Sequence, residues 1–223
     1  MGNLTRVTRY GVVNCYLVQD DDGLTLIDTM IPRSSKAILA AAERLGAPIV
    51  RIVLTHAHGD HIGSLDALAA ALPDAEVLIS ARDARLLVKD TSLDADEPQT
   101  KIKGSVPGAA TAPTRTIAPG ERVGALEVLD AKGHTPGQLA LLDTREGTLF
   151  CGDAYSTLGG VATAARANPR FPVMAIATWH RPTALASAKA LRALSPERLA
   201  PGHGKIVQAP GAAMDAAIAR VKL

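Results

Sequence analysis

A stretch rich in Ile and Val, at residues 49–54, is followed directly by a polar segment with three histidines and one aspartate. A short β-branched apolar run of this kind is typical of a strand inside a sheet. The polar segment, residues 55–61, reads Thr-His-Ala-His-Gly-Asp-His. The chain must therefore fold so that four ionisable side chains stand together at the end of an interior strand.

The side chains of this segment are of the types that bind divalent metal ions. Imidazole nitrogens and carboxylate oxygens suit Zn²⁺ and related ions. Residues i and i+2 of an extended segment point the same way, so His56 and His58 can converge on one ion. The chain then turns at Gly59 into a helix start, which directs Asp60 and His61 toward a neighbouring position. One loop can thus serve two metal sites, and the clustering disfavours the alternative of a solvated polar loop.

Three further ligand-type residues follow predicted strands at glycine-rich turns. His134 lies in Gly-His-Thr-Pro-Gly, Asp153 follows Cys-Gly, and His203 stands between two glycines. Each of these alone is more often an ordinary turn residue. Together with the first cluster, however, they place five of the six histidines at strand ends, which indicates a shared site.

Strand and helix patterns occur in both halves of the chain. The patterns predict strands at residues 10–18, 24–28, 49–54, 76–79, 121–123, 126–129, 138–142, 148–151 and 198–200. They predict helices that run from Ser34 or Ser35 to Leu45, over 65–72, 82–88 and 183–194, and from Ala212 onward. Two irregular stretches, 89–116 and 152–172, interrupt the pattern. Mixed sheets covered by helices, in one domain of residues 1–223, fit this order.

The composition excludes several classes of function. Net charge is +2, from 24 basic and 22 acidic residues, and no run of basic residues points to nucleic acid. The apolar runs are far shorter than a membrane span, and the first residues lack the features of a signal peptide, so we expect a cytoplasmic protein with no membrane partner. Cys15 and Cys151 are too few for a disulfide framework and are expected as small core residues. The oligomeric state stays open.

The ordered motifs His-Ala-His-Gly-Asp-His, Gly-His-Thr-Pro-Gly, Gly-Asp and Gly-His-Gly resemble those of the metallo-beta-lactamase superfamily. The resemblance covers most of the chain, from the first hairpin to His203. It implies an α/β (α+β) fold: a four-layer αβ/βα sandwich of two mixed β-sheets flanked by helices. It also implies a dinuclear metal site at one edge of the sandwich.

The same resemblance implies a role for each ligand-type residue. Asp28 matches an acidic position near the site and is expected to orient a ligating histidine. The expected cofactors are two divalent ions, most simply Zn²⁺, with iron or manganese as alternatives. The first ion would be bound by His56, His58 and His134, the second by Asp60, His61 and His203, and both by a bridging Asp153.

Departures from the family pattern narrow the choice among branches of the superfamily. Asp153 stands where antibiotic-cleaving members usually carry Cys or Ser, which argues against a dedicated β-lactamase. His58 replaces the Glu of the di-iron, flavoprotein-associated branch. The chain then resembles glyoxalase II-like and lactonase-like hydrolases, which attack an ester, thioester or lactone carbonyl with a metal-bound hydroxide. Two alternatives stay open: a mononuclear iron dioxygenase of persulfides, and a ligand-sensing protein that retains the metals.

A few residues are candidates for contact with the substrate. Asp60 is expected to orient the hydroxide. Lactonase-like members place a phenol near the position of Tyr155, where it could donate to the substrate carbonyl; the alternative is a half-buried core tyrosine. His180 would line the pocket or start a helix, and Asn14 would line it or be a satisfied buried amide.

The expected substrate is modest in size. Only 20 residues follow His203, which leaves no room for the helical domain that glyoxalase II-like enzymes use to bind glutathione. We therefore expect S-lactoylglutathione to be a poor substrate beside short-chain esters, thioesters and lactones. Contacts would come from a mixed apolar and basic cover on the two irregular stretches: Lys101, Lys103, Pro107, Leu158, Arg166, Arg170 and Phe171.

Overall fold

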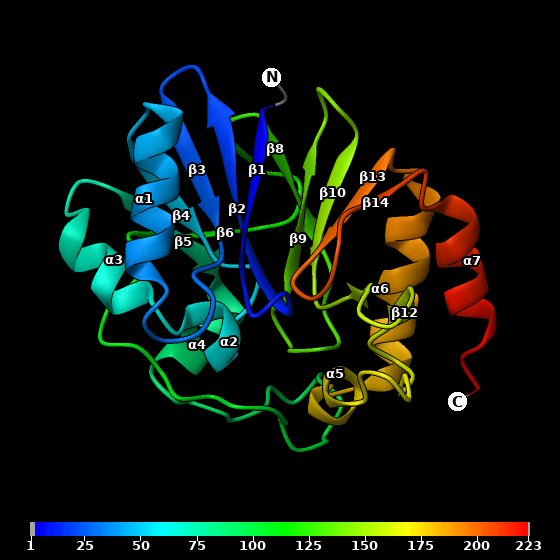
Figure 1. Cartoon of the computed structure of the whole chain (residues 1–223). Coiled ribbons are helices and arrows are strands. Elements are labelled where there is room, and N and C mark those ends of the chain that lie inside the picture. The colour runs from blue at the N-terminus through cyan, green and yellow to red at the C-terminus, as the bar shows by residue number, and fades with distance from the viewer. Residues whose placement is uncertain (1–2, 223) are drawn as a thin grey trace.

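Two six-stranded mixed sheets pack face to face, and helices cover the outer face of each (Figure 1). The computed structural model describes residues 3–222. The first sheet has the order β1 (Leu4–Arg9), β2 (Val13–Asp20), β3 (Gly23–Ile27), β4 (Ile49–Val53), β5 (Glu76–Ser80) and β6 (Arg115–Ile117). The second has the order β14 (Val207–Gln208), β13 (Arg198–Pro201), β10 (Thr148–Gly152), β9 (Leu139–Asp143), β8 (Leu126–Asp130) and β7 (Arg122–Val123). A small ribbon joins β11 (Tyr155–Ser156) to β12 (Ala162–Thr163).

The helices complete four layers. The first sheet is covered by α1 (Ser35–Leu45), α3 (Leu65–Ala71) and α4 (Ala81–Leu87), and the second by α6 (Arg181–Ala193) and α7 (Gly211–Ala219). Two short helices, α2 (Gly59–Ile62) and α5 (Val173–Ala177), lie beyond the strands at the lower edge in Figure 1. The predicted αβ/βα sandwich is confirmed. Within residues 3–222, no helix is long and apolar enough to cross a membrane.

Alternating side chains of the strands divide the core into layers. In β2, Tyr16 and Val18 face the second sheet, whereas Cys15 and Leu17 face the helices. This is the period of two expected when both faces of a strand are buried. Between the sheets, the ring of Tyr16 meets that of Phe150 edge to face, with centroids 5.2 Å apart. The remaining inner layer is almost entirely Val, Leu and Ile, as the low aromatic content requires.

The boundaries differ from the predictions in a few places. The strand predicted at 10–18 begins at Val13, because Tyr10 and Gly11 form a turn in the left-handed region at φ 55° and 68°. The edge strands β1, β6 and β14 were not predicted. β1 is half-exposed and mixes Thr and Arg with its apolar residues, and β6 begins inside the stretch 89–116 that was expected to be irregular. The irregular stretch 152–172 contains the β11–β12 ribbon.

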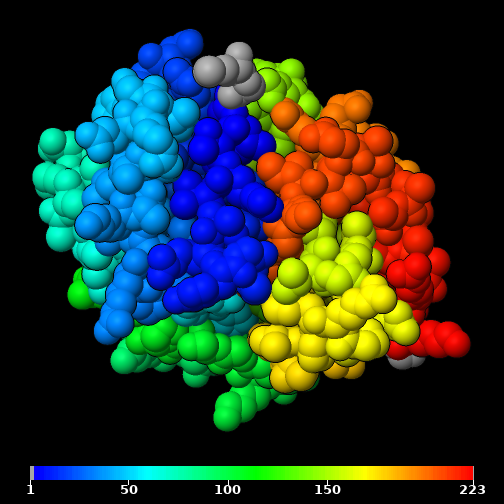
Figure 2. Space-filling model, viewed as in Figure 1, coloured from blue at the N-terminus to red at the C-terminus, as the bar shows by residue number. Residues whose placement is uncertain are grey.

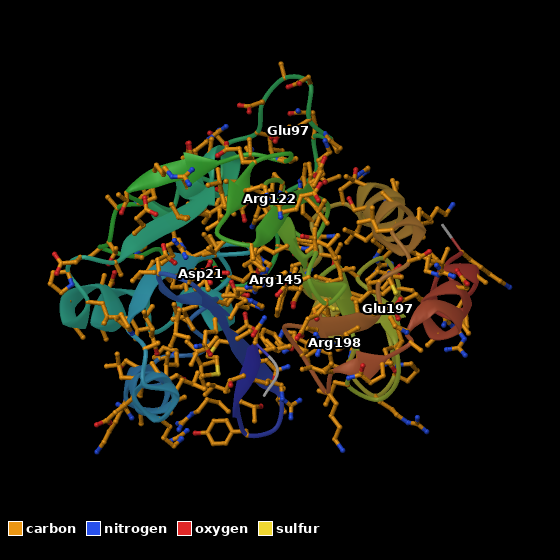
Figure 3. The ribbon with its side chains drawn as sticks, turned by 90° about the horizontal axis from the view of Figure 1, so that it is seen from above. Asp21, Glu97, Arg122, Arg145, Glu197 and Arg198 are labelled. Carbon is orange, nitrogen blue, oxygen red and sulfur yellow. The ribbon has the colours of Figure 1, made fainter. Side chains whose placement is uncertain are left out.

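The topology brings the ligand-bearing turns to one edge. The carboxyl ends of β4, β10 and β13 and the connection from β8 to β9 all lie there. The opposite edge is held by Arg145, which donates to Asp20 Oδ1 and to the carbonyl of Gln19, both at 3.0 Å. Figure 3 looks onto this end, where Arg145 lies between the strands of the two sheets. The two halves are thus joined by polar contacts at the end far from the ligand-bearing turns.

Candidate metal centre

The structure brings all seven predicted ligand side chains together at one edge. His56 and His58 follow β4, while Asp60 and His61 lie in α2. The other three come from the second half of the chain: His134 between β8 and β9, Asp153 after β10 and His203 after β13. Six of the seven are buried, and only Asp60 is partly exposed, with 38% of its side chain accessible.

The candidate ligand atoms form groups in which all members lie within 4.8 Å of one another. Two of these groups coincide with the two ligand sets that the family resemblance implies. A third joins Asp153 to one histidine from each of those sets. The groups are His56, His58 and His134; Asp60, His61 and His203; and His56, His61 and Asp153.

Asp153 stands between the first two groups. Its Oδ2 lies 3.4 Å from Nε2 of His134 and 3.2 Å from Nε2 of His203. Its Oδ1 lies 3.4 Å from Nε2 of His61. One carboxylate therefore reaches histidines of both groups, which is the position a bridging ligand needs.

Each histidine uses its other ring nitrogen to bind a protein acceptor. The Nδ1–H of His61 donates to Asp28 Oδ2 at 2.8 Å, which confirms the expected role of Asp28 in orienting a histidine. Thr55 Oγ1 donates to the same carboxylate at 2.8 Å, so it accepts from Nδ1 of His56 at 3.0 Å. His203 directs Nδ1 at the carbonyl of Val12, 3.3 Å away. Such partners fix the tautomer, so that Nε2 of His56, His61 and His203 is left for a ligand.

The ring nitrogens of His58 and His134 lie in an arrangement that requires a cation or a proton between them. His134 Nδ1 donates to Thr178 Oγ1 at 2.9 Å, because that hydroxyl itself donates to the carbonyl of Met174. His58 Nε2 donates to the carbonyl of Lys103 at 2.9 Å. The two remaining nitrogens carry lone pairs and face each other at 2.9 Å. Two lone pairs at this distance repel unless a positive species is shared between them.

Buried polar atoms without a hydrogen-bond partner also indicate a site for a cation. Nε2 of His56, Nε2 of His61 and Oδ1 of Asp153 have no hydrogen-bond partner among the described residues. A buried polar atom left without a partner costs about 1–3 kcal/mol. All three atoms point into the groups described above, and a bound cation would satisfy them. The donor set of imidazoles and carboxylates therefore fits divalent metal ions.

The two ligand groups differ in how readily their side chains bind protons. Burial lowers the pKa of His134 to about 3, helped by the neighbouring His58 and His61, although the charge of Asp153 opposes the shift. This ring is therefore neutral and ready to bind a cation. Burial also lowers the pKa of His203, but Asp153 and Asp60 outweigh it and raise the value to about 9. Burial raises the pKa of Asp153, yet His203 and His61 hold it well below its ordinary value. Protons therefore compete with a metal ion at His203, in the second group, far more than at His134, in the first.

A buried aspartate behind the cluster holds two of its loops in place. Asp83, in the first turn of α4, accepts the backbone N–H of Ala57 at 3.1 Å and that of Gly137 at 2.7 Å. It also accepts the hydroxyl of Thr135 at 2.7 Å. Sequence reasoning did not find this residue, because an acidic residue in the first turn of a helix is ordinary.

A cavity of about 460 Å³ opens onto the cluster. Gly104 closes against the ring of His58, where a Cβ would collide with the imidazole. Figure 2 shows the covering segments, with the green 89–116 stretch beside the yellow loop and helix that follow β11. The apolar walls of the cavity are Ile31, Pro32, Pro107, Phe171, Val173, Met174 and Ala177.

Comparison with known proteins agrees with this geometry. The sequence profile of the metallo-beta-lactamase superfamily matches residues 8–203. The chain belongs to the metallo-beta-lactamase superfamily. A superfamily relative, the uncharacterized protein YobT of Bacillus subtilis (strain 168), is 48% identical over 211 residues, which cover 94% of this chain and 91% of YobT.

Another relative is named after an enzymatic activity. A hydroxyacylglutathione hydrolase of Stenotrophomonas maltophilia (strain R551-3) is 29% identical over 160 residues, or 70% of this chain and 51% of that protein. The chain thus spans about half the length of this relative. Among solved structures, TTHA1623 in a di-iron-bound form has a TM-score of 0.69 at 28% identity and covers 98% of both chains. The BLEG-1 B3 metallo-beta-lactamase has the same TM-score at 21% identity, covers 93% of this chain and 95% of its own, and shares the fold.

Several expected pocket residues lie elsewhere in this metallo-beta-lactamase domain. The Tyr155 hydroxyl donates to the carbonyl of Ala188 at 2.7 Å, inside the core against α6, and does not reach the cavity. His180 caps the start of α6, where its side chain accepts from the N–H of Thr183. Asn14 is a buried amide that donates to the carbonyls of Pro201 and Gly204.

The lysines and arginines expected over the substrate are also absent from the described lining of the 460 Å³ cavity beside the candidate ligands, called the metal cavity below. Pro107 and Phe171 line it as expected, and Lys103 contributes only its backbone carbonyl to His58. The side chains that were expected at the substrate and do not line this cavity are Lys101, Lys103, Leu158, Arg166 and Arg170. Both cysteines are buried in the core as predicted.

Proposed function

We propose that the chain is a dinuclear metal-dependent hydrolase of a carbonyl substrate: an ester, a thioester or a lactone. The observation that carries the proposal is the position of Asp153 between two complete three-residue ligand groups. The first ion would be held by His56, His58 and His134, and the second by Asp60, His61 and His203. Two divalent ions so held supply a hydroxide nucleophile at neutral pH and an electrophile for the carbonyl oxygen.

Asp60 is the ligand that faces the substrate. It is the most exposed of the seven and lines the cavity. Burial raises its pKa, but the hydrogen bond with His203 and the charge of His61 lower it below the ordinary value. A carboxylate that stays ionised is a weak base and a good hydrogen-bond acceptor. Asp60 would therefore orient the attacking water rather than store its proton.

The cavity lining supports an apolar acyl group. Its walls are Ile, Pro, Phe, Val, Met and Ala side chains, and no Lys or Arg of the described residues is among them. Burial of such walls against an alkyl or aryl group contributes about 25 cal/mol for each Å². A substrate whose recognition depends on several carboxylates finds no matching cations here. We therefore propose short acyl or aryl esters, thioesters and lactones over S-lactoylglutathione.

Zinc is the proposed metal, with iron as the alternative. The imidazole-rich donor set suits both. TTHA1623, which is 28% identical, was solved in a di-iron-bound form. The two metals are distinguished by reconstitution rather than by the ligand types.

The proposal is tested by metal analysis and a substrate panel. Chelator-stripped protein reconstituted with Zn²⁺, and separately with Fe²⁺, should bind close to two equivalents and hydrolyse short-chain esters, thioesters or lactones. Asp60→Ala, the control, should lose most of this activity. One equivalent of iron with oxygen consumed on a persulfide would replace the proposal with a dioxygenase. Absence of turnover on the whole panel, with a thermal shift for one compound, would replace it with a ligand sensor.

A further inference from the structure

A second cavity, of about 370 Å³, lies apart from the metal centre. It is bounded by the loop of residues 159–170 and by Ala217 and Arg220 at the end of the terminal helix α7. In Figure 2 this loop, in yellow, lies directly beside the red terminal helix. None of the described residues that line this cavity also lines the metal cavity. It is therefore a separate space and not an extension of the active-site pocket.

The cavity combines small apolar walls with cationic side chains. Its apolar walls are Val161, Ala162, Ala167, Pro169 and Ala217. Alanines at three of these positions leave volume that larger side chains would fill. A pocket with mostly apolar walls and a few convergent polar groups is the usual form of a small-molecule site.

Three arginines line the cavity, and no acidic residue among the described lining residues balances their charge. Arg166, Arg170 and Arg220 belong to the lining, and none of the described lining residues is acidic. Within residues 3–222 none of the three forms an ion pair, whereas Arg192, which reaches the same helix, pairs with Asp215 at 2.8 Å. All three residues are exposed. A cavity whose charged lining residues are all cationic carries a positive potential, which attracts an anion.

The loop that carries two of the arginines is held in shape by its own hydrogen bonds. Asn168 Nδ2 donates to the carbonyl of Leu158 at 3.1 Å, and its Oδ1 accepts the N–H of Arg170 at 3.1 Å. The N–H of Phe171 closes the turn on the carbonyl of Asn168 at 2.9 Å. Arg170 is thereby laid across Gly159, where a Cβ would collide with its side chain. The cavity wall is preformed, which lowers the entropy cost of binding.

We propose that this cavity binds a small organic anion, with a carboxylate or phosphate group on the arginines and a short apolar part against the alanine and valine walls. Guanidinium groups bind both oxyanions through paired N–H donors. The apolar walls add contact for an alkyl group, so an organic anion should bind more tightly than a bare inorganic ion. The site is distinct from the proposed hydrolytic centre, and its occupant binds without being hydrolysed.

The proposal is tested on the metal-loaded protein by calorimetric titration with hexanoate, hexyl phosphate and hexanol. Hexanoate or hexyl phosphate should bind at least about tenfold more tightly than hexanol, and the tighter of the two identifies the oxyanion. The double variant Arg166→Gln/Arg220→Gln should weaken this binding about tenfold or more while metal content stays the same. Arg44→Gln, on α1 at the far side of the molecule, is the matched control and should change nothing.

Several outcomes would overturn the proposal. Hexanol that binds as well as hexanoate would reduce the cavity to an apolar pocket without anion recognition. Anion binding that survives the double variant and disappears in Asp153→Ala would place the anion on the metal centre. Absence of binding by all three probes would also overturn it. If the double variant is unstable, the single variant Arg220→Gln replaces it, because Arg220 lies outside the loop of residues 159–170. This variant should also weaken anion binding.

Discussion

Asp83 Oδ2 accepts the hydroxyl of Thr135 at 2.7 Å, one residue after the candidate ligand His134. The same oxygen accepts the N–H of Ala57, which lies between His56 and His58. One buried carboxylate thus supports both loops that supply the first ligand group. Its pKa is raised by burial, although the three hydrogen bonds from Thr135, Gly137 and Ala57 oppose the shift.

Asp83→Asn should weaken metal binding without touching a ligand. The amide has one oxygen and an NH2 group that cannot accept, so it loses either the bond from Gly137 or the two bonds from Ala57 and Thr135. Loss of such a supporting residue typically costs about 10–100-fold in metal affinity. Competition with a chromogenic chelator measures this affinity. Asp66→Asn, which removes a carboxylate that accepts backbone N–H groups at an exposed site, is the control; equal affinities for the two variants would contradict a positioning role for Asp83.

Two ligand substitutions should differ in how much metal they lose. His58→Ala removes one ligand of the first group and should leave about one equivalent, whereas Asp153→Ala removes the shared carboxylate and should leave less than one. Activity should fall with metal content in both. His180→Ala is the matched control, since this histidine only caps α6, and it should keep two equivalents. A His58→Ala protein with full metal and full activity would show that the first group is misassigned.

Tyr155→Phe should change stability and not rate. The hydroxyl donates to the carbonyl of Ala188 inside the core, and loss of one such hydrogen bond costs about 0.5–1.5 kcal/mol. Chemical denaturation of the metal-loaded protein measures this cost. If kcat fell more than tenfold while stability stayed the same, the phenol would have to reach the substrate in a conformation other than the one described.

Metal binding should release protons, and affinity should fall as pH falls. Burial lowers the pKa of His203, but the two neighbouring carboxylates raise it to about 9, so the metal-free protein holds a proton there at pH 7. A metal ion at this nitrogen displaces that proton, and the apparent affinity should drop about tenfold per pH unit below pH 9 for each proton released. Calorimetry in two buffers of different ionisation enthalpy counts the protons. An affinity that is constant between pH 7 and 8.5 would contradict the prediction.

Phe171→Ala should discriminate between acyl chains. The ring lines the metal cavity and lies 5.0 Å from the ring of His203, centroid to centroid. Its loss removes apolar contact, so kcat/KM for a hexanoyl ester should fall about tenfold more than for an acetyl ester. Leu194→Ala, an exposed apolar residue at the far end of α6, serves as the control. Equal losses for both esters would place the acyl chain elsewhere.

Local patterns were enough to predict the framework and the ligand cluster. The β-branched run of β4, the amphipathic helix α1 and the histidines at strand ends all depend on short-range periodicity and turn chemistry. The expected serine cap of α1 is absent, because Ser34 makes no side-chain hydrogen bond to the helix N-terminus. Gly46, however, ends α1 in the left-handed region at φ 69°, as its position suggested. These features depend on neighbouring residues alone, whereas the sandwich and the grouping of the seven ligands were expected from the family resemblance.

The cover of the site depends on contacts between distant residues. The stretch 89–116 is held over the cluster by single bonds, such as Trp179 Nε1 to the carbonyl of Thr100 at 2.8 Å and Gly59 N–H to the carbonyl of Ser105 at 3.0 Å. Backbone carbonyls carry no sequence signal of their own. The separation of Arg166 and Arg170 from the metal cavity likewise follows from how the loop folds against α7, which residue type alone does not specify.

The seven candidate ligands come from both sheets, four from turns of the first and three from turns of the second. Ions bound among them would add a cross-link between two halves of the chain, which Asp83 joins at this edge and Arg145 and Asp20 join at the opposite one. Loss of the ions would remove this cross-link, so the ligand-bearing loops would be held by hydrogen bonds alone and would open more often. The loosened loops are what cellular proteases cleave first. The abundance of this protein should therefore follow the metal supply of the cell, independently of its rate of synthesis.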